Sequence, residues 1–212
     1  MQSGARGNYN YRTAFILLGE TLRPVLCGSR ALAPDHGNEA KKEKMEPNET
    51  VLQPRPVSES KSEMIELVLP NDTNPLGALL GGRLMHWIDL AGALAAHRHS
   101  HSYVVTASMD HIDFLVPVHV GDMVLLQSSV NRVFKTSMEV GVRVSVENYI
   151  SSSRQKVGAA YLTFVSVDRH GSRLPVNPVI PETGDEKRRY EGALRRREAS
   201  KAEREQRRAG KS

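Results

Sequence analysis

An acidic side chain stands in the middle of an apolar stretch, where a buried charge is costly unless something pairs with it. Asp89 lies within residues 83–97, whose side chains are apolar nearly all round. A carboxylate in such a place can act as a general base that activates water, or as a nucleophile that forms a mixed anhydride with an acyl group. The sequence does not choose between these roles. A purely structural alternative is a buried Asp paired with a neighbouring Arg or a backbone donor.

Backbone amides can also do chemistry just before this stretch. Gly81 and Gly82 leave N–H groups unshielded at the start of a predicted helix, where a carbonyl oxygen could meet the positive end of the helix dipole. They would form an oxyanion hole, although close packing of a helix against a sheet explains a glycine pair equally well. The side-chain amide of Asn74 can hold a water or a carbonyl, although Asn before Pro is also ordinary turn chemistry.

The elements that position these residues follow from the periodicity of apolar side chains. A short strand over Met64–Leu69 runs into a segment rich in turn formers, and the helix follows Gly81 and Gly82. Residues 138–146 alternate between apolar and polar, as in a sheet with one covered face. The order of one strand, one helix and four strands predicts an α+β hotdog fold, an antiparallel sheet curled around one buried helix. The four later strands are expected over Tyr103–Phe114, Met123–Phe134, Met138–Val146 and Lys156–Val167.

The chain divides into three parts by composition. Residues 1–58 mix Gly, Asn, Pro and charges without periodicity, which predicts a disordered extension. Their first thirty or so residues hold four Arg against one acid, a composition that also suits an organellar transit peptide. Residues 59–181 form the expected hotdog domain. Residues 182–212 alternate acids and bases at helical spacing, which predicts a solvated helical tail.

Bulk composition excludes several classes of protein. A single cysteine, Cys27, excludes an intramolecular disulfide and a multi-cysteine metal site, and it suits the cytoplasm as the expected location. A transit peptide would make the location mitochondrial instead. No apolar run is long enough to span a bilayer. Residues 182–212 carry eleven Lys and Arg against seven Asp and Glu, so most of the net charge of +5 lies in the tail. With 5% aromatic residues besides, nucleic acid is not an expected partner.

Other residues are weaker candidates for chemistry. The alternate spacing of His97, His99 and His101 at a helix end does not favour convergence on one metal ion. Trp87 lies beside Asp89 and either lines a tunnel for an apolar substrate or, more simply, belongs to the core. Reserve acids, should Asp89 not be the catalytic one, are Asp110 and Asp113.

An ordered set of motifs resembles the acyl-CoA thioesterases of the hotdog fold, in the branch that includes brain acyl-CoA hydrolase. The resemblance covers about 120 residues, from Ser62 to Glu182, and leaves both tails outside. The segments that carry it are residues 69–77, Gly81 with Gly82, Asp89, residues 104–108, Phe114, Pro117, residues 120–122, residues 136–139, residues 163–167, residues 174–176 and residues 179–183.

The resemblance implies a site shared between two chains. Asn74 of one chain would work with Asp89 of the facing chain, and the helix start would polarise the thioester. A homodimer is therefore required, and relatives commonly assemble three dimers into a hexamer. The implied substrates are medium- to long-chain acyl-CoA, without a metal or redox cofactor. Contacts to the nucleotide of coenzyme A would come from the turn between the third and fourth strands, from Arg132, Lys135, Thr136 and Ser137.

Two other functions fit the same fold. A hydratase or dehydratase acts on the acyl chain and needs a His paired with an acid, and His86 lies three residues before Asp89. A non-catalytic acyl-CoA sensor would keep the fold and the ligand site without turnover. The spacing between the glycine pair and Asp89 favours hydrolysis over the hydratase. A sensor fused to DNA-binding helices would show amphipathic helices in the first 58 residues, and their sequence shows no such pattern.

Overall fold

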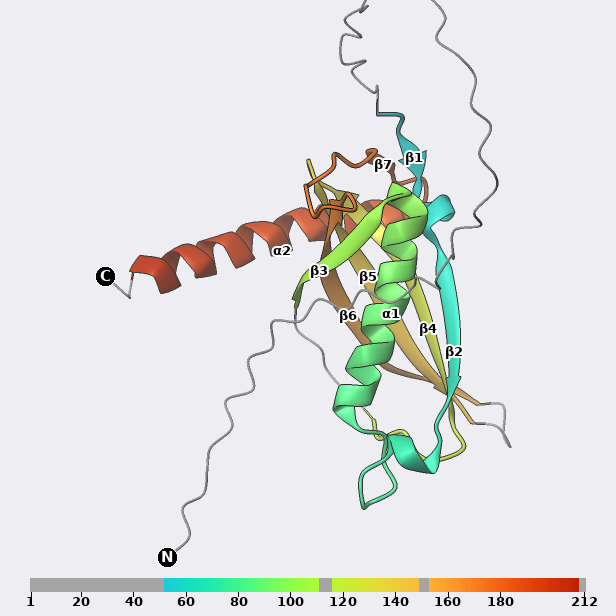
Figure 1. Cartoon of the computed structure of the whole chain (residues 1–212). Helices are drawn as coiled ribbons and strands as arrows, with labels where there is room; N and C mark the ends of the chain where they lie inside the picture. The colour runs from blue at the N-terminus through green and yellow to red at the C-terminus, as the bar shows by residue number, and fades with distance from the viewer. Residues whose placement is uncertain (1–51, 111–115, 149–152, 210–212) are drawn as a thin grey trace, which may run out of the picture. The chain divides into compact units, whose positions relative to one another are not determined.

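The structure of the chain is a computed structural model, and it describes residues 52–110, 116–148 and 153–209 (Figure 1). Most of the extension expected over residues 1–58 lies outside the described residues, as do Cys27, Asp113 and Phe114. No helix within the described part is long and apolar enough to cross a membrane.

Five antiparallel strands form one sheet with the order β2-β4-β5-β6-β3. The strands span Ser62–Leu67 (β2), Tyr103–Met109 (β3), Met123–Val133 (β4), Ser137–Glu147 (β5) and Arg154–Val167 (β6). The predicted strands are confirmed, except that β3 ends at Met109. The alternation predicted for β5 is also observed, because Val140, Val142 and Val144 are buried whereas Arg143 is exposed. One face of the sheet therefore builds the core.

Helix α1, Gly81–Ser100, lies across that face, as Figure 1 shows. Gly92 touches the sheet most closely, because a Cβ there would lie 2.9 Å from the ring of Phe164 on β6. The predicted buried helix is confirmed on the side that faces the sheet, where Leu84, Ile88, Ala91 and Ala95 are buried. Met85, Leu90 and Leu94 on another side remain 42–45% exposed, so within the described residues part of the apolar surface of the helix is uncovered.

The folded part begins before residue 59, the predicted domain boundary. Strand β1, Arg55–Pro56, pairs in parallel with β7, Val179–Ile180, and a 3-10 turn, Val57–Ser60, follows β1. Val57 is 1% exposed, and the buried hydroxyl of Ser60 accepts a hydrogen bond from the amide of Val130 at 2.9 Å. A two-residue strand is too short to show any periodicity, so it could not be predicted from the pattern of apolar residues.

Helix α2, Gly184–Ala209, packs its first half on the outer face of the sheet. Ala193 is fully buried, and the guanidinium of Arg196 binds the Glu139 carboxylate at 2.6 and 3.1 Å while lying 3.6 Å over the Tyr161 ring. The helix was predicted, but its expected solvation was wrong for this half. Arginines that stack on aromatic rings bury their stems, and composition does not distinguish them from solvated arginines.

Candidate active site

A buried carboxylate organises the loop that leads into α1. Asp72 ends a 3-10 turn, Pro70–Asp72, and accepts hydrogen bonds from Arg83 Nε at 2.6 Å and from the Leu69 amide at 3.1 Å. The bond from Arg83 holds the pKa of this carboxyl below its ordinary value. The Leu80 amide donates to the Asp72 carbonyl at 2.9 Å. Because Arg83 lies in the first turn of α1, these bonds fix the helix tip to the loop. In the sequence, Asp72 does not stand out from the other turn-forming residues of this segment.

The amides at the helix tip are open. Arg83 and Leu84 donate their N–H groups to the Leu80 carbonyl at 3.0 and 3.1 Å, and the Leu80 side chain caps nothing. Gly81 and Gly82 precede them and are exposed, so their amides are the ones left without helical acceptors. A Cβ at Gly82 would meet nothing within 4 Å. Packing within one chain therefore gives no reason for a glycine at this position.

An apolar hollow of about 230 Å³ adjoins the helix tip. A slender apolar chain could enter here with its carbonyl near the glycine amides. Trp87 does not line this hollow. It is 5% exposed, belongs to the main core and lies under the Arg83 guanidinium, 5.9 Å from the ring centre. The hollow is lined by Leu79, Gly81, Leu84, Val116, Pro117, Val118 and Val157.

Asn74 uses its side-chain oxygen inside the loop. Oδ1 accepts hydrogen bonds from the amides of Leu76 at 2.9 Å and Ala78 at 3.1 Å. Two donors on one atom identify that atom as the oxygen, so the NH₂ group of Asn74 is the part that remains to donate. Asn74 therefore stabilises the turn, which was the structural alternative predicted from the sequence. Its NH₂ group is still available to donate to a carbonyl oxygen.

Asp89 is half-buried, and its partner is a hydroxyl rather than an Arg. Thr106 Oγ1, on β3, donates to Asp89 Oδ1 at 2.7 Å. A β-bulge follows Thr106 in its pairing with β6, and bulges commonly re-aim a side chain next to a site. Sequence reasoning missed this role for Thr106, although it noted the surrounding motif. Gly92 and Ala96, which follow Asp89 on the helix, are buried, and Gly92 packs against the sheet.

A single chain does not assemble all of these groups. Gly82 and Asp89 lie seven residues apart on one helix, about 10 Å along its axis. No hydrogen bond among the described residues joins Asn74 to Asp89. His86, the residue that a hydratase would pair with an acid, makes no hydrogen bond with Asp89 in the described part of the chain. The geometry therefore leaves a donor pair at the helix tip and a carboxylate two turns away.

The turn expected to contact the nucleotide lies at the other end of the sheet. Strand β4 begins opposite Leu67, near the loop into α1, and ends at Val133. Arg132 lies 4.0 Å over the Tyr190 ring, and the Ser137 hydroxyl accepts a bond from Arg197 at 3.3 Å, so α2 engages both side chains. Lys135 is exposed, and the Thr136 carbonyl accepts a bond from the Ser166 amide.

The histidines near the end of α1 diverge. His97 Nδ1 lies 2.9 Å from the Ser102 carbonyl at the surface, whereas His99 is fully buried with Nε2 2.9 Å from the Asn177 carbonyl. Burial lowers the pKa of His99. The described residues contain no cluster of three or more metal-ligating side chains. Of the reserve acids, Asp110 is half-buried at the end of β3.

Comparison with known proteins identifies the family. A family profile described as the thioesterase superfamily matches residues 76–149. The chain is 41% identical over 138 residues to the Bacillus subtilis acyl-CoA thioester hydrolase YkhA, covering 65% of this chain and 80% of that protein. A hexameric acyl-CoA thioesterase crystallised without ligand shares 43% identity and a TM-score of 0.70, with 72% of this chain and 97% of that one covered. The chain belongs to the acyl-CoA thioester hydrolases of the thioesterase superfamily, and it is a thioester hydrolase.

A Staphylococcus aureus acyl-CoA hydrolase, crystallised with butyryl coenzyme A and coenzyme A, offers a comparison at the residue level. It is 36% identical with a TM-score of 0.68, and the match covers 73% of this chain and 94% of that one. Single alanine variants of that protein replace an Asn, an Asp and a Thr. Those three positions are separated by 15 and 17 residues, the same spacings that separate Asn74, Asp89 and Thr106.

Proposed function

We propose that the chain hydrolyses medium- to long-chain acyl-CoA at sites built by two copies together. One copy contributes Asp89, and the other contributes Asn74 with the Gly81 and Gly82 amides. The observation that carries the proposal is the open side of α1, where Asp89 lies among exposed apolar residues and is held by Thr106 on an edge strand. The Asp89 carboxylate would therefore contact any molecule that binds to the exposed side of α1.

A second copy fits this open side. Within the described residues, strand β3 pairs only with β6, so its other edge is free. Tyr103 and Val105 on β3 are 57% and 48% exposed, and Leu90 and Leu94 on α1 are exposed as well. An exposed apolar edge strand is a template for pairing with another strand, and a two-fold pair buries the same patch on both copies. Such a dimer would bring the helix tip of one chain toward Asp89 of the other.

The reaction follows from the donors and the base. The acyl carbonyl oxygen would accept hydrogen bonds from the glycine amides and from the Asn74 NH₂ group, which stabilise the negative charge that develops on it. Asp89 would take a proton from water as the water oxygen attacks the carbonyl carbon, with Thr106 fixing the carboxylate. The carbon–sulfur bond then breaks, and coenzyme A leaves as the thiolate. We assign Asp89 the role of base rather than nucleophile, because it is half-exposed and water can reach its second oxygen.

Assembly beyond the dimer rests on a second patch. Ile65, Leu67 and Leu69, on and after the other edge strand β2, are 47–60% exposed. Contiguous apolar surface of this kind favours a further subunit contact. We propose a trimer of dimers, in line with the hexameric relatives. The proposed enzyme needs no metal or redox cofactor and works in the cytoplasm, which suits its single cysteine.

The test is complementation between two inactive variants. Asp89→Ala and Asn74→Ala should each lower kcat roughly a hundredfold or more, the size expected for a lost base. Co-expressed with different affinity tags, the two variants should form mixed dimers with one intact site. Random pairing of a two-fold dimer then restores about a quarter of the parent activity. Thiol release from acyl-CoA of several chain lengths measures both effects.

Two results would refute the proposal. A shared site is wrong if purified mixed dimers are no more active than either variant alone. The catalytic assignment is wrong if Asp89→Ala hydrolyses acyl-CoA as fast as the parent. A non-catalytic sensor would bind acyl-CoA and release no thiol in any form.

A further inference from the structure

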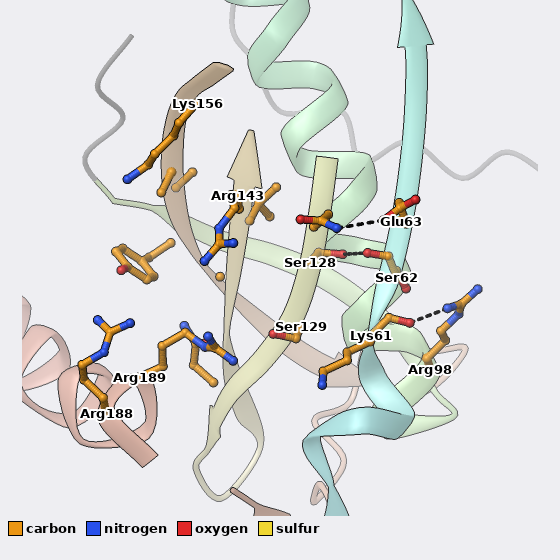
Figure 2. Close-up of a pocket in the computed structure, with 17 residues that line it drawn as sticks. Lys61, Ser62, Glu63, Arg98, Ser128, Ser129, Arg143, Lys156, Arg188 and Arg189 are labelled. Atoms are coloured by element: carbon orange, nitrogen blue, oxygen red, sulfur yellow. Dashed lines mark hydrogen bonds between the residues drawn. The ribbon is translucent and has the colours of Figure 1, made fainter. Parts of the chain in front are cut away.

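The outer face of the sheet carries a basic groove that the proposed catalysis does not use. The groove has a volume of about 720 Å³ and lies between strands β2, β4, β5 and β6 and the first turns of α2 (Figure 2). Its one acidic residue is Glu63, which accepts a hydrogen bond from Gln127 at 2.9 Å. We call it the outer-face groove, and its six basic side chains are Lys61, Arg98, Arg143, Lys156, Arg188 and Arg189.

Three of these cations are uncompensated. Arg143, Lys156 and Arg189 make no ion pair or hydrogen bond within the described part of the chain. Lys61 is paired with Glu186 at 3.1 Å, and Arg188 forms only an exposed pair with an acid three residues earlier. Figure 2 shows Arg143 and Arg189 reaching from the sheet and from α2 toward the same space. Like charges gathered in one hollow repel each other unless an anion neutralises them, so the groove attracts anions.

The floor of the groove contains a second unmet group. Asn131 is 2% exposed and donates to Glu139 at 3.0 Å, but its Oδ1 has no hydrogen-bond partner. Gly141 makes room for this side chain, since a Cβ there would lie 2.8 Å from Asn131 Nδ2. A buried acceptor without a partner is unfavourable. Because this oxygen has no exposed surface, a ligand with an N–H or O–H donor could bind it only if the Asn131 side chain turned toward the groove.

We propose that the outer-face groove binds a small organic polyphosphate, with Arg143, Lys156 and Arg189 on the phosphates. The guanidinium forks suit phosphate oxygens in pairs, and the ammonium adds a point charge. The volume lies in the range of small-molecule sites. A nucleic-acid strand fits less well, because the only aromatic residue lining the groove is Tyr161 and Arg196 already covers its ring.

Two kinds of ligand could bring phosphates to the groove. The phosphates can belong to a free nucleoside diphosphate, or to the coenzyme A of an acyl-CoA held by another copy of the chain. The second source rests on the proposed function, whereas the first does not. The groove's lining includes Arg98 from the C-terminal end of α1, but it includes neither Asp89 nor the residues of the helix tip, so in a single chain the groove is separate from both.

Calorimetric titration of the full chain with ADP and with inorganic pyrophosphate tests the proposal. The parent should bind both, and added salt should weaken binding. Arg143→Ala and Arg189→Ala should each weaken ADP binding at least tenfold. Lys187→Ala is the matched control. This substitution removes one positive charge from the same turn of α2, but Lys187 is exposed and does not line the groove. The affinity of the Lys187→Ala variant for ADP should equal that of the parent.

A second titration separates the two sources. If the groove takes coenzyme A phosphates, saturating coenzyme A abolishes ADP binding, and Arg143→Ala weakens coenzyme A binding as well. If the groove takes a free nucleotide, ADP binds equally well with coenzyme A present. The proposal is overturned if neither ADP nor pyrophosphate binds at low salt, or if Arg143→Ala and Arg189→Ala bind ADP as the parent does. It is also overturned if these variants change only the mass of the assembly, which would make the groove a subunit contact.

Discussion

Asp89 depends on one hydroxyl for its position. The 2.7 Å bond from Thr106 holds Oδ1 and leaves the other oxygen available to water. Asp89 could be chosen from the sequence because an acid inside an apolar helix is unusual. Thr106 could not, because its contact depends on how β3 lies beside α1, and a threonine in a strand is ordinary. The sequence thus singled out the carboxylate and missed the hydroxyl that orients it.

Replacing Thr106 tests this positioning role. Thr106→Val keeps the shape of the side chain and removes the donor. A hydrogen bond to a charged group contributes about 1.5–3 kcal/mol, so kcat should fall roughly tenfold to a hundredfold. KM should change little, because the hydroxyl acts through Asp89 and does not bind substrate. Thr106→Ser, which keeps the donor, should recover most of the rate. Equal loss in the Val and Ser variants would point to packing instead.

Gly82 at the start of α1 and Gly92 in its middle have different surroundings. At the helix tip, Gly82 has open space where a Cβ would go, whereas Gly92 lies against the Phe164 ring. Periodicity predicted the helix, its approximate ends and the alternation of β5. It could not distinguish a glycine kept for access from one kept for packing. It also could not reveal that α2 packs through stacked arginines, because charged residues at helical spacing suit a solvated helix equally well.

The contrast between these glycines gives a prediction about α1. Gly82→Ala should raise stability by up to about 1 kcal/mol, because Ala is the better helix former and meets no neighbour. The same methyl should obstruct the approach of a thioester oxygen to the amides and lower kcat at least tenfold. Thermal unfolding and thiol release measure the two effects. Unchanged activity in a stabilised Gly82→Ala would remove the helix tip from the mechanism.

Gly92→Ala provides the control for that variant. Its methyl would lie 2.9 Å from the buried Phe164 ring, so overpacking should cost about 1–3 kcal/mol of stability. The protein that remains folded should keep an intact helix tip. A stability loss with normal turnover per folded molecule is therefore expected, the reverse of the result for Gly82→Ala.

In the described part of the molecule, one side of the central helix and the free edge of β3 are uncovered. The exposed apolar residues there are Leu90 and Leu94 on α1 and Tyr103 and Val105 on β3, two elements that are adjacent in sequence. The sequence indicated a buried helix but not which part of the burial would come from a second chain. A pattern of apolar residues predicts that a helix face is buried, but it does not indicate whether the same chain or a second chain buries it.

Introducing a charge into each apolar patch should show which patch forms the dimer and which joins dimers into a hexamer. Val105→Asp puts an unpaired carboxylate into the proposed β3 interface, which is unfavourable once that surface is buried. The variant should become monomeric in light scattering and lose most of its activity, since each site would lack its second half. Ile65→Asp, on the β2 patch, should yield dimers that remain active. Val120→Asp changes a similarly exposed valine outside both patches and should alter neither mass nor rate.

These three variants test whether activity follows the dimer. If catalysis needs two chains, the rate per chain should rise with concentration for Val105→Asp, as monomers are driven together, and stay constant for Ile65→Asp. A monomeric Val105→Asp with the parent's rate would show that one chain holds a complete site. In that case the distance of about 10 Å along α1 between Gly82 and Asp89 would have to be bridged within a single copy, in which no hydrogen bond among the described residues joins Asn74 to Asp89.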